Sequence, residues 1–135
     1  MPGIASIKTL NIPSVAEGPK VTLSLTFMNV GDEADQFWVS VDEYEGDVTM
    51  NVSAGTGGAT NIFNKKIEDL YYPDQLATFY KDLVVPQKDK WQLRISVGHY
   101  SDPAKTVQQV DDYKDVTVLK NKLVPQEKTW VDMIS

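Results

Sequence analysis

The chain has 135 residues, the size of a single domain. It contains no cysteine, which excludes disulfide scaffolds, thiolate metal sites and cysteine nucleophiles, and it has one histidine, His99. Its 19 acidic and 13 basic residues give a net charge of -6, which repels phosphate backbones and argues against nucleic-acid binding. No apolar run approaches the ~20 residues of a membrane span, and the N-terminus lacks the pattern of a secretion signal.

The first part of the chain predicts strands separated by turns. Ile4–Ile12 alternates weakly between apolar and polar residues. Lys20–Asn29 alternates strictly over eight residues, a period of two that no helix could arrange on one face. Gln36–Tyr44 has the same period, and residues 44–47 are typical of a tight turn into a further strand over 48–52.

The second part continues in the same way after a small-residue loop, AGTGGAT, at 54–60. Ile62–Leu70 fits a strand or a short helix, because its apolar positions match either period. Leu76–Val85, Trp91–His99 and Tyr113–Leu119 read as strands. Seven or eight short strands without a convincing helix predict an all-β fold, an antiparallel two-sheet sandwich over residues 1–120 with a C-terminal tail at 121–135.

Three segments resemble immunoglobulin-like modules of the CARDB type, cell-adhesion-related domains of bacterial and archaeal surface proteins. VTLSLTFMNVGDEADQFWVSV (21–41) resembles the family's hairpin in which an alternating strand ends in Asn-x-Gly. DLYYPDQLATFYKDLVVP (69–86) is similar to its proline-containing link into the next strand. WQLRISVGHY (91–100) with VDDYKDVTVL (110–119) resembles its closing hairpin. The resemblance implies an immunoglobulin-like β-sandwich and does not imply one function.

Neither His99 nor the glycine-rich loop indicates catalysis or phosphate binding. His99 ends a predicted strand on the same side as its core residues, and no G-x-S-x-G elbow accompanies it. We therefore expect a structural histidine near the rim of the sandwich and no enzyme. AGTGGAT lacks the lysine of a phosphate-binding loop.

Acidic residues in two loops are weak candidates for a calcium site. Calcium takes several oxygen ligands, and the two groups could meet if their loops converge at one end of the sandwich. A solvated acidic rim is the simpler interpretation, because neither group has the spacing of a known ligand loop. The four candidates are Asp32, Asp35, Asp42 and Asp47.

Several aromatic residues fall outside the predicted core positions. A flat row of aromatic rings on a sheet can stack on sugar rings, although such rings can also cover the ends and edges of the core. The candidates for polysaccharide binding are Trp38, Tyr44, Tyr71, Tyr72 and Tyr100, and Tyr80 also lies outside the core positions.

The tail after the last strand is rich in apolar residues, which we expect to be buried somewhere. It could fold back over its own sheet, or it could add to an unpaired edge of a neighbour and so act in assembly. These candidate interaction residues are Leu123, Val124, Trp130, Val131, Met133 and Ile134.

The sequence thus favours a non-catalytic structural or interaction module. An adhesion-type sandwich with an initiating methionine and no export signal fits a virion or cell surface, as in a capsid decoration protein or an adhesion domain. The partner would be another protein or a second copy. The alternative is a carbohydrate-binding module that uses exposed aromatic residues.

Overall fold

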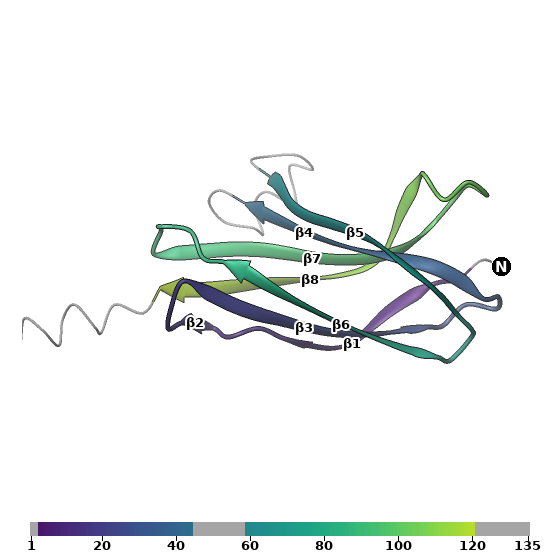
Figure 1. The fold of residues 1–135 in the computed structure, drawn as a ribbon, viewed down its shortest axis with the longest axis horizontal. Helices are drawn as coiled ribbons and strands as arrows, with labels where there is room; N and C mark the ends of the chain where they lie inside the picture. The colour runs from purple at the N-terminus through teal and green to yellow at the C-terminus, as the bar shows by residue number, and fades with distance from the viewer. Residues whose placement is uncertain (1–2, 45–58, 121–135) are drawn as a thin grey trace, which may run out of the picture.

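The computed structural model describes residues 3–44 and 59–120. They form eight strands in two sheets that pack face to face, which confirms the predicted all-β, immunoglobulin-like sandwich (Figure 1). Among the described residues there is no apolar helix of bilayer-spanning length.

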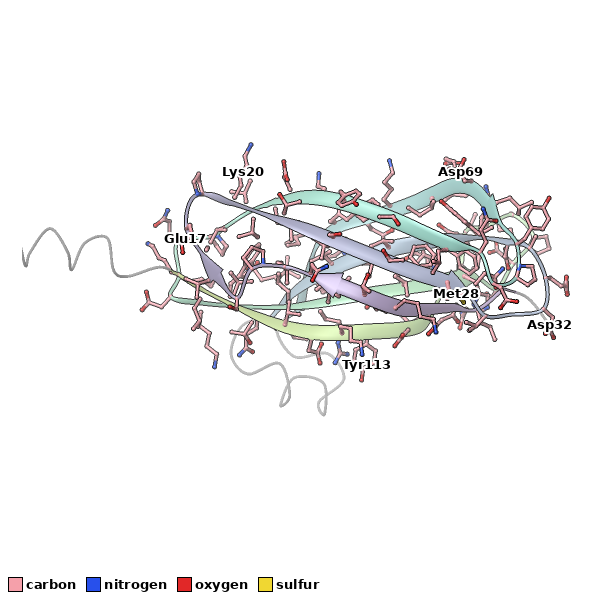
Figure 2. All side chains as sticks on the ribbon, turned by 90° about the horizontal axis from the view of Figure 1, so that it is seen from below. Glu17, Lys20, Met28, Asp32, Asp69 and Tyr113 are labelled. Carbon is pink, nitrogen blue, oxygen red and sulfur yellow. The ribbon has the colours of Figure 1, made fainter. Side chains whose placement is uncertain are left out.

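One sheet has three strands, in the order β1 (Ala5–Asn11), β3 (Lys20–Asn29) and β6 (Leu76–Val84), all antiparallel. β3 lies in the middle of this sheet, and its strict alternation gives it one buried face. The outer face of this sheet is towards the viewer in Figure 2, where Lys20 and Met28 mark opposite ends of β3.

The other sheet has five strands. Its order is β2 (Val15–Ala16), β8 (Gln108–Lys120), β7 (Lys90–Tyr100), β4 (Asp35–Tyr44) and β5 (Ala59–Tyr71). β2 runs parallel to β8, whereas the other pairs are antiparallel. The expected purely antiparallel sandwich is therefore wrong for this one short pair.

The core lies between the sheets and is built by residues of one parity on each strand. Phe27 of β3 meets Phe37 of β4 edge to face, with ring centroids 5.7 Å apart. Each fully buried side chain of this kind contributes about 1.5–3 kcal/mol to folding. The other fully buried large apolar residues are Leu23, Leu25, Val39, Val41, Trp91, Leu93, Ile95, Val97 and Val118.

The structure settles the element that the sequence left ambiguous. Ile62–Leu70 is part of strand β5, which pairs along β4 and turns Phe63 and Ile67 towards the core. The last strand begins at Gln108, earlier than predicted, and the loop predicted at 54–60 ends sooner because Ala59 and Thr60 already belong to β5. The predicted strand over 48–52 and most of the turn before it lie outside the described residues.

Candidate interaction surface

The free edge of β1 is capped by two carboxylates from the opposite sheet. The backbone N–H of Ala5 donates to Asp111 Oδ2 at 2.9 Å, and that of Ile7 donates to Asp112 Oδ2 at 2.8 Å. These bonds occupy two of the outward N–H groups that an edge strand otherwise offers to another chain. These contacts therefore obstruct strand pairing at the N-terminal half of β1.

His99 takes part in the same contact. Its Nδ1 lies 2.8 Å from Asp111 Oδ1, and the carboxylate also accepts from Ala5. The imidazole thus positions the carboxylate that holds β1, which agrees with the expected structural histidine at the strand end.

The edge of the five-stranded sheet at β5 is protected by charge. Lys65, Lys66, Glu68 and Asp69 follow one another closely along this strand. Charged side chains on an edge discourage pairing with another strand because pairing would strip water from them. This edge is thus a poor docking site for an apolar partner.

The edge strand β6 exposes large apolar side chains to a greater degree than β5, whose Ile62 and Leu70 are 39% and 49% exposed. Leu76, Tyr80 and Val84 are 51%, 66% and 71% exposed. They share the outer face of the three-stranded sheet with Thr78 and Asp82, since the other parity of β6 points into the sandwich. The edge of β6 that pairs with no strand of the described residues is its free edge, and we call this edge and the outer face of Leu76–Val84 the β6 surface.

The hydrogen bonds between β3 and β6 show which backbone groups of β6 point to the free edge. The N–H of Asn29 donates to Gln75 O at 3.1 Å, and the N–H of Val85 donates to Pro19 O at 2.9 Å, at the two ends of the β3–β6 ladder. Groups that face the partner strand alternate along an antiparallel ladder. Odd-numbered residues of β6 therefore face β3, and the N–H and C=O of its even-numbered residues point to the free edge.

Of the two charged side chains of β6, Asp82 accepts a hydrogen bond from Thr22 Oγ1 of β3 at 2.7 Å, and Lys81 is drawn inwards. The Lys81 ammonium lies 5.0 Å from the centroid of the Phe63 ring on β5, and Phe63 in turn packs against Phe79 with centroids 5.6 Å apart. A lysine projecting from an edge strand would deter pairing, but this one is attracted to the aromatic face. Lys81 therefore leaves the β6 edge accessible.

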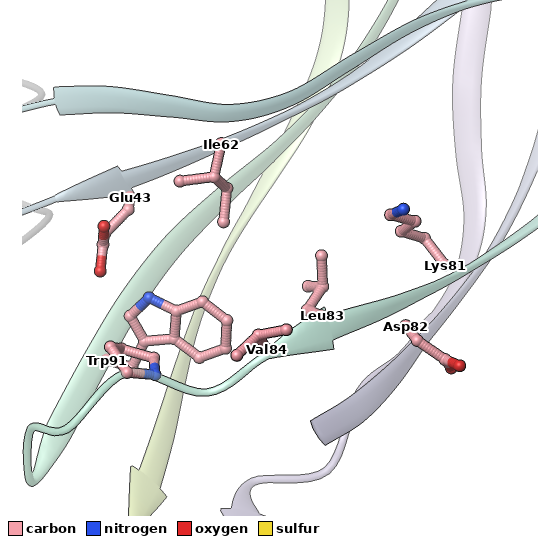
Figure 3. Close-up of a pocket in the computed structure, with 8 residues that line it drawn as sticks. Glu43, Ile62, Lys81, Asp82, Leu83, Val84 and Trp91 are labelled. Atoms are coloured by element: carbon pink, nitrogen blue, oxygen red, sulfur yellow. The ribbon is translucent and has the colours of Figure 1, made fainter. Parts of the chain in front are cut away.

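A pocket of about 300 Å³ opens beside the end of β6, between the two sheets (Figure 3). Trp91 forms its buried wall, and the indole Nε1 of Trp91 has no hydrogen-bond partner in the described part of the chain. Ile62 reaches the pocket because it is the extra residue of a β-bulge between β4 and β5. The remaining lining residues are Glu43, Lys81, Asp82, Leu83, Val84 and Pro86.

The aromatic residues proposed for sugar stacking do not form one exposed row. Trp38 is only 2% exposed, since its ring packs on Gly98 and its Nε1 donates to His99 O at 2.8 Å. Tyr44 and Tyr100 are also buried, which removes them as stacking surfaces, and Tyr71 is half-buried. Of the five, Tyr72 alone is well exposed, at 60%.

Asp35 and Asp42, one from each acidic group proposed for calcium, lie far apart. Asp35 begins β4 and Asp42 lies near its other end, about 23 Å away along an extended strand. Asp35 is already bound, because it accepts from Lys105 Nζ at 2.7 Å and from the N–H of Gly3 at 3.1 Å. Asp42 accepts from Asn61 Nδ2 at 2.9 Å, and Asp32 is exposed at the far end of the sandwich (Figure 2).

The surroundings of Asp35 lower the pKa of its carboxyl group. Burial raises the pKa of its carboxyl, but hydrogen bonds from Lys105, Gln36 and Gly3 together with the Lys105 charge lower it by more, so the pKa lies below 3.8. The carboxylate therefore remains ionised and paired at neutral pH. No group of three or more potential metal-ligating side chains of the His, Cys, Asp and Glu types occurs within residues 3–44 and 59–120.

Two sets of candidates remain predictions. The six apolar residues of the tail and Asp47 lie outside the described residues. By contrast, the β6 surface was not singled out from the sequence. The sequence feature that could have indicated it is that segment 76–85 has apolar residues on both faces, whereas a strand with one buried face needs them on only one.

Comparison with known proteins supports the fold. The sequence matches no family model and no curated protein. The structure is similar to a CARDB domain from Pyrococcus furiosus solved with di-metal ions, with a TM-score of 0.58, 13% identity, and coverage of 88% of this chain and 89% of that one. The resemblance to CARDB-type modules is thus confirmed for the fold.

Similar sandwiches occur as parts of larger proteins. A DNA glycosylase from Pseudomonas fluorescens, solved with DNA, matches with a TM-score of 0.55 and 12% identity over 85% of this chain and 30% of that one. A β-glucosidase from Listeria innocua matches with a TM-score of 0.53 and 16% identity, over 88% of this chain and 16% of that one. At these identities the likeness concerns the fold, and proteins of different activity share it.

Proposed function

We propose that this domain is a non-catalytic protein-interaction module whose partner binds at the β6 surface. The observation that carries the proposal is the exposed apolar stripe of Leu76, Tyr80 and Val84 on a strand with a free backbone edge. Strand addition to such an edge derives affinity from backbone hydrogen bonds and specificity from neighbouring side chains and pockets. Exposed tyrosine and aliphatic residues in one stripe are typical of protein contacts.

The environment of the titratable groups supports a non-catalytic role. His99 and Asp111 hold β1, and Asp35 holds Lys105 and the N-terminal segment. Each of these partly buried groups has a structural partner that accounts for its position. Asp35 and Lys105 also line an open hollow of about 310 Å³, but their charges are paired with each other there.

The setting that fits this proposal is a cell or virion surface. The CARDB-like fold favours an adhesion-type role, and a capsid decoration protein is the virion counterpart. The partner would be a protein or a second copy, because the net charge of -6 opposes nucleic acid. We expect no insertion into a membrane.

A binding experiment tests the role of the β6 surface. Three proteins are immobilised separately on beads: the wild-type chain, Val84→Lys, and a matched control, Val110→Lys, which changes an exposed valine of the other sheet. Each is exposed to the same cell-envelope fraction of the source organism. We expect Val84→Lys to reduce the retained protein at least about tenfold, since it places a charge in an apolar contact. Equal retention by all three proteins would contradict the proposal.

Carbohydrate binding is the second candidate, favoured by the surroundings of Tyr80. This ring is exposed on a face where Ser24 lies opposite it, and Thr26 and Thr78 are neighbours that could hydrogen-bond sugar hydroxyls. A glycan array with the wild type, Tyr80→Ala and Tyr72→Ala tests this. Binding to one glycan class that Tyr80→Ala abolishes would support it, and the absence of any bound glycan would exclude it.

Calcium binding stays a proposal for Asp32 and the residues around it. If an ion binds there, millimolar calcium should raise the melting temperature and a chelator should reverse the effect. An Asp32→Asn variant should then show no calcium response.

A further inference from the structure

The β6 surface is complementary to a second copy of itself. If two β6 strands run antiparallel with Tyr80 opposite Tyr80, the nine residues Leu76–Val84 all find partners. On the outer face Leu76 then lies opposite Val84, and Thr78 lies opposite Asp82. The two apolar ends and the central tyrosine therefore meet apolar or aromatic neighbours, which are favourable cross-strand pairs.

The backbone supports the same alignment. The N–H and C=O groups of the even-numbered residues point to the free edge, as the bonds of Asn29 and Val85 to their partners show. With Tyr80 opposite Tyr80, each even residue faces another even residue. Both strands then present donors and acceptors to each other along their whole length.

Neighbouring alignments are less favourable for reasons of charge and overlap. Moving the centre to residue 81 places Lys81 opposite Lys81, and moving it to residue 82 places Asp82 opposite Asp82. Like charges directly opposite one another destabilise a strand pair. Moving the centre to residue 79 sets Leu76 against Asp82 and leaves Val84 beyond the end of the partner strand.

We propose that the partner of the β6 surface is a second copy of this chain, joined by antiparallel β6–β6 pairing centred on Tyr80. The two three-stranded sheets then form one six-stranded sheet across a twofold axis. Such an interface is closed, because the same patch is used on both subunits and none is left for further growth. This inference rests on the proposed function, since it names the partner of the same surface.

Charge variants at residue 80 test the alignment, because only there does a residue meet its own copy. Tyr80 is exposed, so Tyr80→Lys and Tyr80→Glu should leave the fold intact. In sedimentation velocity over a concentration series, we expect a wild-type dimer and at least a tenfold weaker dimer for each variant alone. An equimolar mixture of the two variants should dimerise again, since opposite charges then face each other.

Cysteine cross-linking provides an independent measurement, because the chain has no cysteine of its own. In the proposed pairing the Cα atoms of the two residues 80 lie about 5.5 Å apart, as in any hydrogen-bonded antiparallel pair. The two residues 84 lie roughly 27 Å apart, eight residues along the strand. A short bismaleimide should therefore link Tyr80→Cys and should not link the matched control Val84→Cys.

The outcomes separate this inference from the function on which it rests. A wild type that stays monomeric at every concentration overturns the dimer, and so does a dimer that neither residue 80 variant weakens. Efficient linking through residue 84 overturns the alignment. In each case the retention of an envelope protein, and its loss in Val84→Lys, still decides whether the β6 surface binds a different protein.

Discussion

The ring of Trp38 packs directly on Gly98, its register partner across the β4–β7 pair. A Cβ at residue 98 would lie 2.8 Å from Cζ2 of Trp38 and 1.7 Å from the carbonyl oxygen of Gln109. A β-bulge lies at the same place, between Val97 and Gly98 in their pairing with β8. The close approach of the β7–β8 hairpin to Trp38 therefore depends on the missing side chain.

The first prediction concerns this glycine. Gly98→Ala should destabilise the domain by about 3 kcal/mol or more, because the methyl group would meet a backbone oxygen that cannot move alone. Gly18→Ala is the matched control, since a Cβ there meets nothing within 4 Å. Urea unfolding measures both. A Gly98→Ala variant as stable as Gly18→Ala would show that the hairpin does not pack as described.

The second prediction concerns acid stability. The pKa of Asp35 is lowered in the folded protein, chiefly by Lys105 against the opposing effect of burial, so the unfolded chain binds a proton first as the pH falls. The contribution of Asp35 to stability is therefore complete well above pH 3.8 and is lost as the pH falls through the folded value.

The variant Lys105→Asn tests this dependence. Lys105 has a positive φ of 59°, which asparagine tolerates, so the substitution removes the charge and retains the backbone preference. The melting temperature of the variant should lie below that of the wild type at pH 7, and the difference should shrink as the pH falls further and further below 3.8. A difference that is constant with pH would contradict the role assigned to this ion pair.

The third prediction concerns the cap on β1. Asp111→Ala with Asp112→Ala removes the acceptors of the Ala5 and Ile7 N–H groups. Hydrogen exchange at these two amides should accelerate by about tenfold or more, because each bond contributes about 1 kcal/mol or slightly more. Amides in the centre of β3 serve as the internal control, and equal acceleration there would indicate global destabilisation instead.

The fourth prediction concerns Arg94 on the outer face of the five-stranded sheet. Its Nε and Nη2 donate to the two carboxylate oxygens of Asp115 at 2.7 and 2.9 Å, and its guanidinium lies 3.8 Å from the Tyr113 ring centroid. Arg94→Lys should cost about 1 kcal/mol, since lysine keeps the charge and loses the paired geometry and the stacking. A double-mutant cycle with Asp115→Asn should give a coupling energy of the same size, and a coupling near zero would contradict this.

The sequence alone was sufficient for the fold class and for most strands, although it left 62–70 undecided and did not predict β2. The alternation from Val21 to Phe27 shows which side chains share the buried face, because residues two apart in a strand point to the same side. This pattern, repeated along the chain, determined an all-β sandwich before any contact between strands was known.

Only the tertiary structure decided which of these residues are available for binding. Trp38 is buried by Gly98, sixty residues away, and Asp35 is held by Lys105, seventy residues away. β6 becomes a free edge only because of the order in which distant strands pair. Sheet order, and what covers an individual side chain, depend on contacts between remote parts of the chain, whereas a periodicity of two residues shows only which side chains share a face.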